Sequence, residues 1–142
     1  MSRFIVGHAT HAHWRGALAL AAAQVDAQRV TAAPSDSGEA ALGLVYFTDH
    51  YAPQAEPLLA ALRERWPGVA WAGAVGVGVC AGGVEYFDEP ALVLMLCPLP
   101  PGRFRIFSGA RALGGFEAAT ALVHADPGTH DTSAHKQHDH RA

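Results

Sequence analysis

Cysteine and basic charge are both scarce in this chain, and each shortage excludes a class of protein. The 142 residues include two cysteines, too few for the disulfide framework of a small secreted domain. Cys80 and Cys97 lie far apart among apolar residues, so we predict that both are unpaired core residues. Ten Lys and Arg stand against thirteen Asp and Glu. Arg103, Arg105 and Arg111 are too sparse for the basic face of a nucleic-acid binder, so we expect no such partner.

Long apolar runs are also missing. The apolar residues 4–6 are far fewer than a secretory signal needs, and no run approaches the roughly 20 residues that span a bilayer. We therefore predict a cytoplasmic protein without a membrane partner. Half of the residues are hydrophobic and the length suits one domain, so the chain can bury a core of its own.

Catalytic motifs are the third absence. Ser108 stands in Phe-Ser-Gly-Ala, which is not the Gly-x-Ser-x-Gly nucleophile elbow. Glu85, Asp88 and Glu89 surround an aromatic pair, and paired carboxylates do acid–base work in some enzymes. Beside Pro90 they are more typical of an exposed hairpin tip. We predict that the chain is not an enzyme, and an enzyme of unknown reaction is kept as an alternative.

The sequence does contain apolar runs that alternate with helical periodicity. Leu18, Ala21 and Val25 recur at helical spacing and predict a helix from residue 14, and a second helix is expected over residues 57–66. Strands are expected at residues 4–6, 42–47, 69–79, 84–87, 91–97, 103–107 and 119–124. Two β-α-β crossovers followed by antiparallel strands predict an α/β fold, with a mixed β-sheet on which the helices pack.

The third expected strand, residues 69–79, runs into a segment rich in glycine. Glycine inside a strand often marks close approach by a ligand or by another backbone. The spacing fits neither a dinucleotide fingerprint nor a P-loop. One interpretation is a small-ligand floor made of Gly73, Gly76, Gly78, Cys80 and Gly82. The other interpretation is tight packing of the strand on a helix, with Gly82 and Gly83 turning the chain.

Three histidines, His8, His11 and His13, follow the first expected strand. Imidazole is a common ligand of metals and of haem iron. No Cys or Glu nearby completes a zinc set, so we predict no metal site and interpret the three as polar loop residues near a pocket mouth. His8 is the one that we expect to contact a ligand.

Asp49 and His50 follow the expected strand at residues 42–47. Ligands of open α/β sheets bind beyond the carboxyl ends of strands, so both side chains are candidate ligand contacts on the rim of a pocket. Thr48 and Asp49 are also candidates for capping the next helix, and capping is the favoured interpretation.

The last fifteen residues differ in composition from the rest of the chain. Residues 128–142 hold four histidines and no large apolar residue. We predict one folded domain over residues 1–127, followed by a disordered, histidine-rich tail over residues 128–142 that collects metal only adventitiously.

Four pieces of the chain, taken in order, resemble the N-terminal half of the FIST domain. They are LVYF at 44–47, PLLAALR at 57–63, GAVGVGV at 73–79 and EYFDEPAL at 85–92. The resemblance covers most of residues 3–127, and residues 1–8 and 119–127 lie where the family has strands. The chain leaves no room for the family's C-terminal half.

The resemblance implies a sensory and signal-transduction module. Members of the family sense small molecules, amino acids among them, for attached kinase, cyclase or receptor modules. Some are similar to haem-binding nitric-oxide sensors, so haem held by His8, His11 or His13 is the alternative. We predict a non-catalytic domain that binds a small-molecule ligand and no cofactor. Because the second half is missing, open strand edges favour a homodimer or a signalling protein partner.

Overall fold

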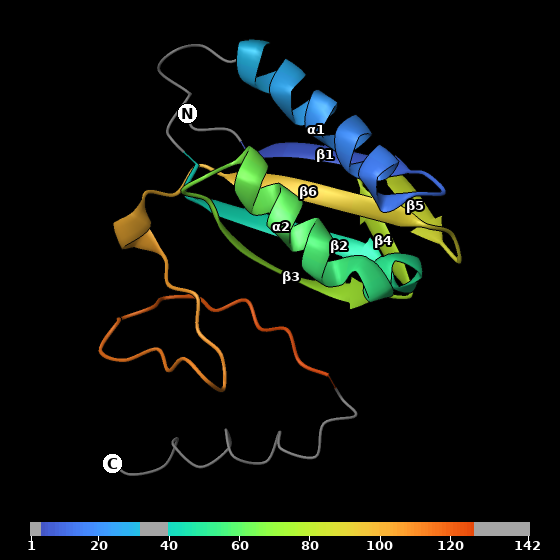
Figure 1. Ribbon diagram of the computed structural model, residues 1–142. Helices are drawn as coiled ribbons and strands as arrows, with labels where there is room; N and C mark the ends of the chain where they lie inside the picture. The colour runs from blue at the N-terminus through green and yellow to red at the C-terminus, as the bar shows by residue number, and fades with distance from the viewer. Residues whose placement is uncertain (1–3, 32–39, 127–142) are drawn as a thin grey trace.

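The computed structural model describes residues 4–31 and 40–126. Two helices cover one face of a four-stranded sheet, and a small hairpin lies at one end of that sheet (Figure 1). The elements are β1 (Ile5–Thr10), α1 (Trp14–Thr31), β2 (Leu42–Thr48), η1 (Asp49–Gln54), α2 (Ala55–Arg65), β3 (Ala70–Gly76), β4 (Gly78–Ala81), β5 (Val84–Phe87), β6 (Ala91–Cys97) and η2 (Pro101–Arg103). The predicted tail, residues 128–142, lies outside the described residues.

The sheet has the strand order β1-β6-β2-β3. Strands β1 and β2 are both antiparallel to β6, whereas β2 and β3 are parallel. Helix α2 joins β2 to its neighbour β3, and helix α1 joins β1 to β2 across the intervening β6. The predicted α/β fold with a mixed sheet and two crossovers is therefore confirmed, and β6 is the strand that makes the sheet mixed.

The core lies between the sheet and the two helices. Val45 pairs with Leu94, and Phe47 pairs with Leu92, so that these four side chains share the helix-covered face. All four are at most 4% exposed. Strand residues alternate between the two faces of a sheet, which places the intervening residues on the opposite face.

Small residues let α1 lie directly on the sheet. Ala17, Ala21 and Ala22 are fully buried. A Cβ atom added to Gly7 of β1 would lie 2.1 Å from the carbonyl oxygen of Ala21. Only glycine lets the β1 backbone lie this close to the α1 backbone. The small alanine side chains of α1 allow the same close contact from the helix side. The packing thus follows from small side chains on both elements.

Glutamines from α1 cover the outer edge of β1. The Gln24 side chain accepts a hydrogen bond from the His8 amide (3.1 Å) and donates one to the His8 carbonyl (2.7 Å). Gln28 donates to the Val6 carbonyl at 2.6 Å. These bonds replace the ladder that a neighbouring strand would provide, so this edge is not open to another strand.

The strand expected over residues 69–79 is wrong in its extent. The chain forms β3 in the main sheet and then β4 in a separate two-stranded sheet with β5. A Cβ atom on Gly76 would lie 3.1 Å from the Gly78 carbonyl oxygen, so the chain bends sharply there. Val77, at the bend, is 69% exposed. Apolar alternation continues through the bend, which is why the pattern predicted one strand.

The strands expected at residues 103–107 and 119–124 are also wrong. After η2 the described chain is irregular apart from a single bridge between Ser108 and Arg111. Leu122 and Val123 are 61% and 64% exposed. Alternating residues favour an extended chain, but a strand also needs a partner for its backbone groups, and these segments have none. No helix within the described ranges is long and apolar enough to cross a membrane.

Candidate functional site

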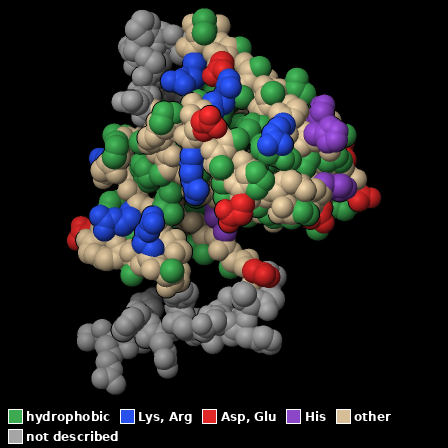
Figure 2. Space-filling model, in the orientation of Figure 1, with side chains coloured by type: hydrophobic (Ala, Val, Ile, Leu, Met, Phe, Trp, Pro, Cys, Tyr) green, Lys and Arg blue, Asp and Glu red, His purple; other side chains and the backbone are tan. Residues whose placement is uncertain are grey.

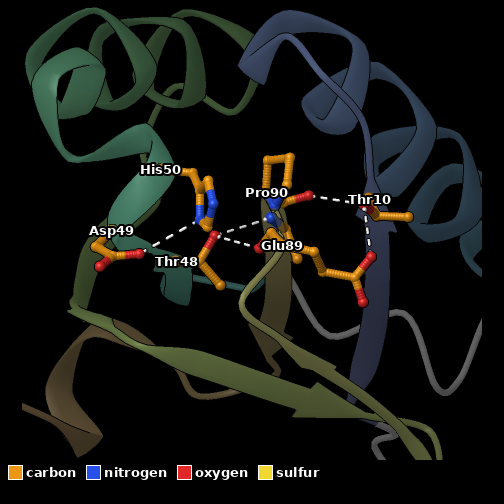
Figure 3. Close-up of polar contacts among 7 residues, drawn as sticks. Thr10, Thr48, Asp49, His50, Glu89 and Pro90 are labelled. Carbon is orange, nitrogen blue, oxygen red and sulfur yellow. Dashed lines mark hydrogen bonds and ion pairs between the residues drawn. The ribbon is translucent and has the colours of Figure 1, made fainter.

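Polar side chains gather where β1 and β2 end and β6 begins (Figure 3). The histidines visible in the space-filling view lie mainly at this same end of the molecule (Figure 2). Of the predicted contact residues, Asp49 and His50 lie on this edge directly after β2. His8 lies within β1 rather than in a loop after it, because that strand extends to Thr10.

Thr48, the last residue of β2, is fully buried and holds the turn before β6. Its hydroxyl donates to the Glu89 carbonyl at 2.8 Å and accepts a bond from the Ala91 amide at 3.0 Å. Pro90 has no N–H to donate, so the hydrogen bonds between β2 and β6 stop there. The Thr48 hydroxyl bonds to the backbone groups on either side of Pro90 instead. The expected helix cap at Thr48 is therefore wrong: its side chain makes no capping bond, and η1 stands between β2 and α2.

Thr10, the last residue of β1, holds the same turn from the other side. Its hydroxyl donates to the Pro90 carbonyl at 2.8 Å and lies 3.3 Å from a carboxylate oxygen of Glu89 (Figure 3). The ends of both strands thus fix the backbone of the turn and the Glu89 carboxylate. The neighbouring Asp88 has a φ of 55° and is exposed, as expected of a turn.

Asp49 and His50 form an exposed acid–imidazole pair. An oxygen of the Asp49 carboxylate lies 3.3 Å from Nδ1 of His50 (Figure 3). The two side chains are 62% and 38% exposed, in that order. The other ring nitrogen, Nε2, is a hydrogen-bond donor or acceptor according to the tautomer of the ring. The pair can therefore offer a negative charge and a ring nitrogen to the same small molecule.

His8 joins the sheet to the hairpin. Its side chain is on the face away from the helices, and Nδ1 lies 2.6 Å from the hydroxyl oxygen of Tyr86 on β5. Burial raises the pKa of Tyr86, and the nearby Glu89 carboxylate raises it further. The hydroxyl therefore stays protonated, and the tautomer of the His8 ring decides which of the two groups donates.

The turn of the hairpin packs against the other nitrogen of His8. Gly82 and Gly83 have φ values of 58° and 81°, which suit a type I′ turn between two strands. A Cβ atom on Gly82 would lie 3.3 Å from Nε2 of His8. Glycine at this position therefore meets two requirements, the backbone conformation and the room for the imidazole.

Close packing accounts for one glycine of the predicted floor. A Cβ atom on Gly73 would lie 1.7 Å from the Val45 carbonyl oxygen, so the neighbour that requires glycine is the backbone of β2. At Gly78 the nearest atom is the Tyr86 carbonyl oxygen, at 3.0 Å. Both neighbours are backbone atoms of a strand, so these glycines allow close approach between strands rather than the packing on a helix that was expected. Contact between a ligand and these glycines stays a prediction.

The two cysteines differ in their surroundings. Cys97 is buried, as predicted, but Cys80 is exposed, so its assignment to the core is wrong. In the hairpin Val79 pairs with Tyr86 on the face toward the sheet, and Cys80 pairs with Glu85 on the outer face. The apolar run suggested a strand covered on both sides, whereas this hairpin is covered on one side only.

The remaining histidines, His11 and His13, belong to the start of α1. The His13 amide donates to Nδ1 of His11 at 3.0 Å, and the His13 carbonyl accepts from the first turn of the helix. Over residues 4–31 and 40–126, no three His, Cys, Asp or Glu side chains gather closely enough to hold a metal ion. His8 faces the hairpin turn and His11 bonds its own loop, and no observation on the described residues favours a haem.

Two open hollows lie elsewhere on the described part of the chain, toward the amino ends of β2 and β3. One, of 420 Å³, lies beside the last turns of both helices and is bordered by Arg29, Arg65 and Trp66. The other, of 390 Å³, is lined by Ala70, Phe104, Arg105, Ile106, Arg111 and Ala112. Neither borders Asp49 or His50.

Three residues of this edge did not stand out in the sequence as parts of a site. Thr10 and Tyr86 bond to groups about 80 positions away in the chain, and Thr48 bonds to groups about 40 positions away. A threonine that ends a strand ahead of a polar turn is a weak signal, and no spacing rule links it to a distant proline.

Comparison with known proteins gives one match. The model of the family described as the FIST N domain matches residues 41–138. The matched range begins after β1 and α1 and extends beyond the last described residue. Neither the search of curated proteins nor the search of solved structures gave a match. The resemblance inferred from the sequence is therefore confirmed.

Proposed function

Because the chain belongs to the FIST N domain family, we propose that it is a non-catalytic sensory module of signal transduction that binds a small polar ligand at the carboxyl edge of its sheet. The observation that carries the proposal is the exposed Asp49–His50 pair beside a turn fixed by Thr48 and Thr10. Rigid backbone on both sides of the partly exposed acid–imidazole pair lowers the ordering cost of binding.

The chemistry of the edge favours a ligand with a cationic group. Asp49 and Glu89 offer carboxylates, and no Lys or Arg occurs between residues 66 and 102. An ammonium group with a further hydrogen-bonding group would meet the Asp49 carboxylate and a ring nitrogen of His50 together. Free amino acids and amines have this chemistry. His8 and the glycines around the hairpin are the contacts that we propose on the other side.

Sensing requires a ligand that prefers one conformation of the domain. The hairpin joins the sheet through the His8–Tyr86 bond and through packing of β4 across β1, β6 and β2. A ligand that bridges the strand ends and the hairpin would favour one position of the hairpin. We propose that a signalling protein or a second copy of the chain detects that difference.

A thermal-shift screen of the whole chain against amino acids, amines, nucleotides and divalent cations tests the site. A ligand that binds only the folded state raises the melting temperature by mass action. We expect an amine-bearing compound to raise it, and the increase to vanish in Asp49→Asn and to shrink in His50→Gln. Arg29→Ala, which changes the hollow at the opposite end, is the matched control.

The outcomes separate the proposal from its rivals. A shift that survives both edge variants but disappears in Arg29→Ala would move the site to the hollow beside the helix ends. A panel in which no compound shifts the wild type would contradict a small-ligand sensor of this chemistry. No observation on the described residues favours the haem alternative or an enzyme.

A further inference from the structure

The outer face of the hairpin presents an exposed aromatic ring between carboxylates. Phe87 is 73% exposed, and Glu85 and Asp88 beside it are exposed as well. Glu85 and Phe87 share one face of β5, since residues two apart on a strand point the same way. We call Glu85, Phe87 and Asp88 the acidic knob. Aromatic side chains are among the residues enriched at protein–protein contact surfaces, whose rims are polar.

The hollow of 390 Å³ has the complementary chemistry. Phe104, Ile106 and the alanines supply apolar lining, and Arg105 and Arg111 supply two guanidinium groups. No Asp or Glu occurs between residues 90 and 116. We call this lined space the basic hollow. In Figure 2 arginine side chains gather at the lower left, with acidic atoms at the left edge beside them, and further acidic side chains occur at the right-hand end.

Local contacts hold the Arg105 side chain and the Arg111 backbone in place. Arg105 donates from one guanidinium nitrogen to the Leu113 carbonyl at 3.1 Å and lies over the Phe116 ring at 5.1 Å. The Arg111 backbone is bonded to Ser108 in both directions, at 2.7 and 3.0 Å. Groups that are fixed before binding lose less entropy on binding. The hollow therefore has the properties of a prepared contact surface.

We propose that the acidic knob of one copy of this chain docks into the basic hollow of a second copy. Phe87 enters the apolar lining, and Glu85 and Asp88 face Arg105 and Arg111. The two surfaces lie at opposite ends of the molecule, with the hairpin at one end of the sheet and the segment after η2 at the other (Figure 1). Made once between two copies, the contact is head-to-tail and produces rings or open chains, whereas made twice between antiparallel copies it closes a two-fold dimer.

A second copy is the occupant because one chain carries both halves of the contact, with charges of opposite sign on its two ends. Pairing through the edge of β1 is not available, since Gln24 and Gln28 already bond to that edge. This inference does not depend on the ligand proposed above, because neither surface includes Asp49 or His50.

Sedimentation velocity on the whole chain, over a range of concentrations and at two salt levels, tests the contact. We expect the mean mass to rise with concentration at low salt. We expect association to weaken strongly at about 1 M salt, where the screening length falls to about 3 Å. Phe87→Ala should lower the association constant about tenfold or more, as loss of a central aromatic side chain does.

Charge reversal with mixing separates a lost contact from a misfolded variant. In Glu85→Arg and in Arg111→Glu the two surfaces of one chain repel each other, so each variant alone should stay monomeric. An equimolar mixture should associate again, because each variant then meets the opposite charge on the other. Glu64→Arg and Arg63→Glu, two reversals of exposed residues on α2, should associate like the wild type.

Three results would overturn the proposal. One is a wild-type chain that stays monomeric at every concentration. Binding of an unrelated acidic peptide by such a monomeric chain would not rescue the proposal. Another is association that is equally strong at high salt and in both reversal variants. The third is a mixture of the two variants, each shown by circular dichroism to be folded, that remains monomeric.

Discussion

Nδ1 of His8 lies 2.6 Å from the Tyr86 hydroxyl oxygen, and this contact joins β1 to the hairpin across 78 positions of sequence. An isolated two-stranded hairpin is marginally stable in water, so β4 and β5 depend on what they touch. Tyr86 itself is 9% exposed. The contact is therefore one of those that hold the hairpin on the sheet, together with the packing of β4 across β1, β6 and β2.

Tyr86→Phe should loosen the hairpin without unfolding the domain. The change removes the hydroxyl that bonds His8 and keeps the ring, so we expect a loss of about 1 kcal/mol in the free energy of unfolding. Amide hydrogen exchange over residues 78–87 should become faster. Urea denaturation and exchange mass spectrometry measure the two effects.

A second tyrosine–histidine pair provides the control. The hydroxyl of Tyr46 lies 2.9 Å from Nε2 of His124, but this bond is exposed. Because water replaces an exposed bond readily, Tyr46→Phe should change the free energy of unfolding by no more than about 0.5 kcal/mol. Equal effects of the two changes would contradict a special role for the His8 contact.

Thr48→Val should destabilise the turn before β6. Valine keeps the shape of threonine but leaves the Glu89 carbonyl and the Ala91 amide without their side-chain partner in a buried place. Each unsatisfied buried group costs about 1–3 kcal/mol. Thr48→Ser, which keeps the hydroxyl, should retain most of the stability in the same urea titration. A valine variant as stable as the serine variant would show that the two bonds contribute little.

Thiol labelling should distinguish the two cysteines. Burial raises the pKa of the Cys97 thiol, which lowers its thiolate fraction, and it also blocks access by reagents. Cys80 is exposed. A disulfide reagent at neutral pH should therefore modify one thiol per native chain and a second only after urea is added. Cys80→Ser should abolish the fast reaction, and fast modification in that variant would contradict the burial of Cys97.

Gly73→Ala should be among the most damaging small substitutions in this chain. The added Cβ atom would overlap the Val45 carbonyl oxygen of the neighbouring strand, which has no flexible end that can move away. We expect a loss of about 3 kcal/mol in the free energy of unfolding, since overpacking costs 1–3 kcal/mol and more when backbone must shift. Gly102→Ala, where no atom lies within 4 Å, should be nearly neutral. Similar melting temperatures of the two variants would refute the close approach of the two strands at Gly73.

Local patterns were sufficient for the elements that form the main sheet. Apolar runs gave β2 and β6, and the spacing of Leu18, Ala21 and Val25 gave α1, because burial on one face or on both leaves its period in the sequence. The same reasoning failed at residues 103–107 and 119–124. Alternation reports the conformation that a segment favours, whereas a strand exists only when another strand accepts its hydrogen bonds.

Part of the candidate site was likewise predictable from local patterns, and part depended on the tertiary structure. The position of Asp49 and His50 after a buried strand was enough to place them on the carboxyl edge of the sheet. The Thr10 and Thr48 bonds to the turn at Pro90 and the exposure of Cys80 depended on which strands became neighbours. So did the separation of the acidic knob from the basic hollow, because sequence order says nothing about which ends of the molecule two segments occupy.

The sequence by itself determined the α/β class, the family and most of the helices and strands, since these depend on short-range periodicity and on residue size. Tertiary structure alone decided that β6 inserts between β1 and β2, and that the glycine-rich strand breaks at Gly76 to form a hairpin. The physical reason is that hydrogen bonds between strands and contacts such as His8 with Tyr86 join residues that are distant in the chain. Their energies depend on the whole packed sheet and not on any local pattern.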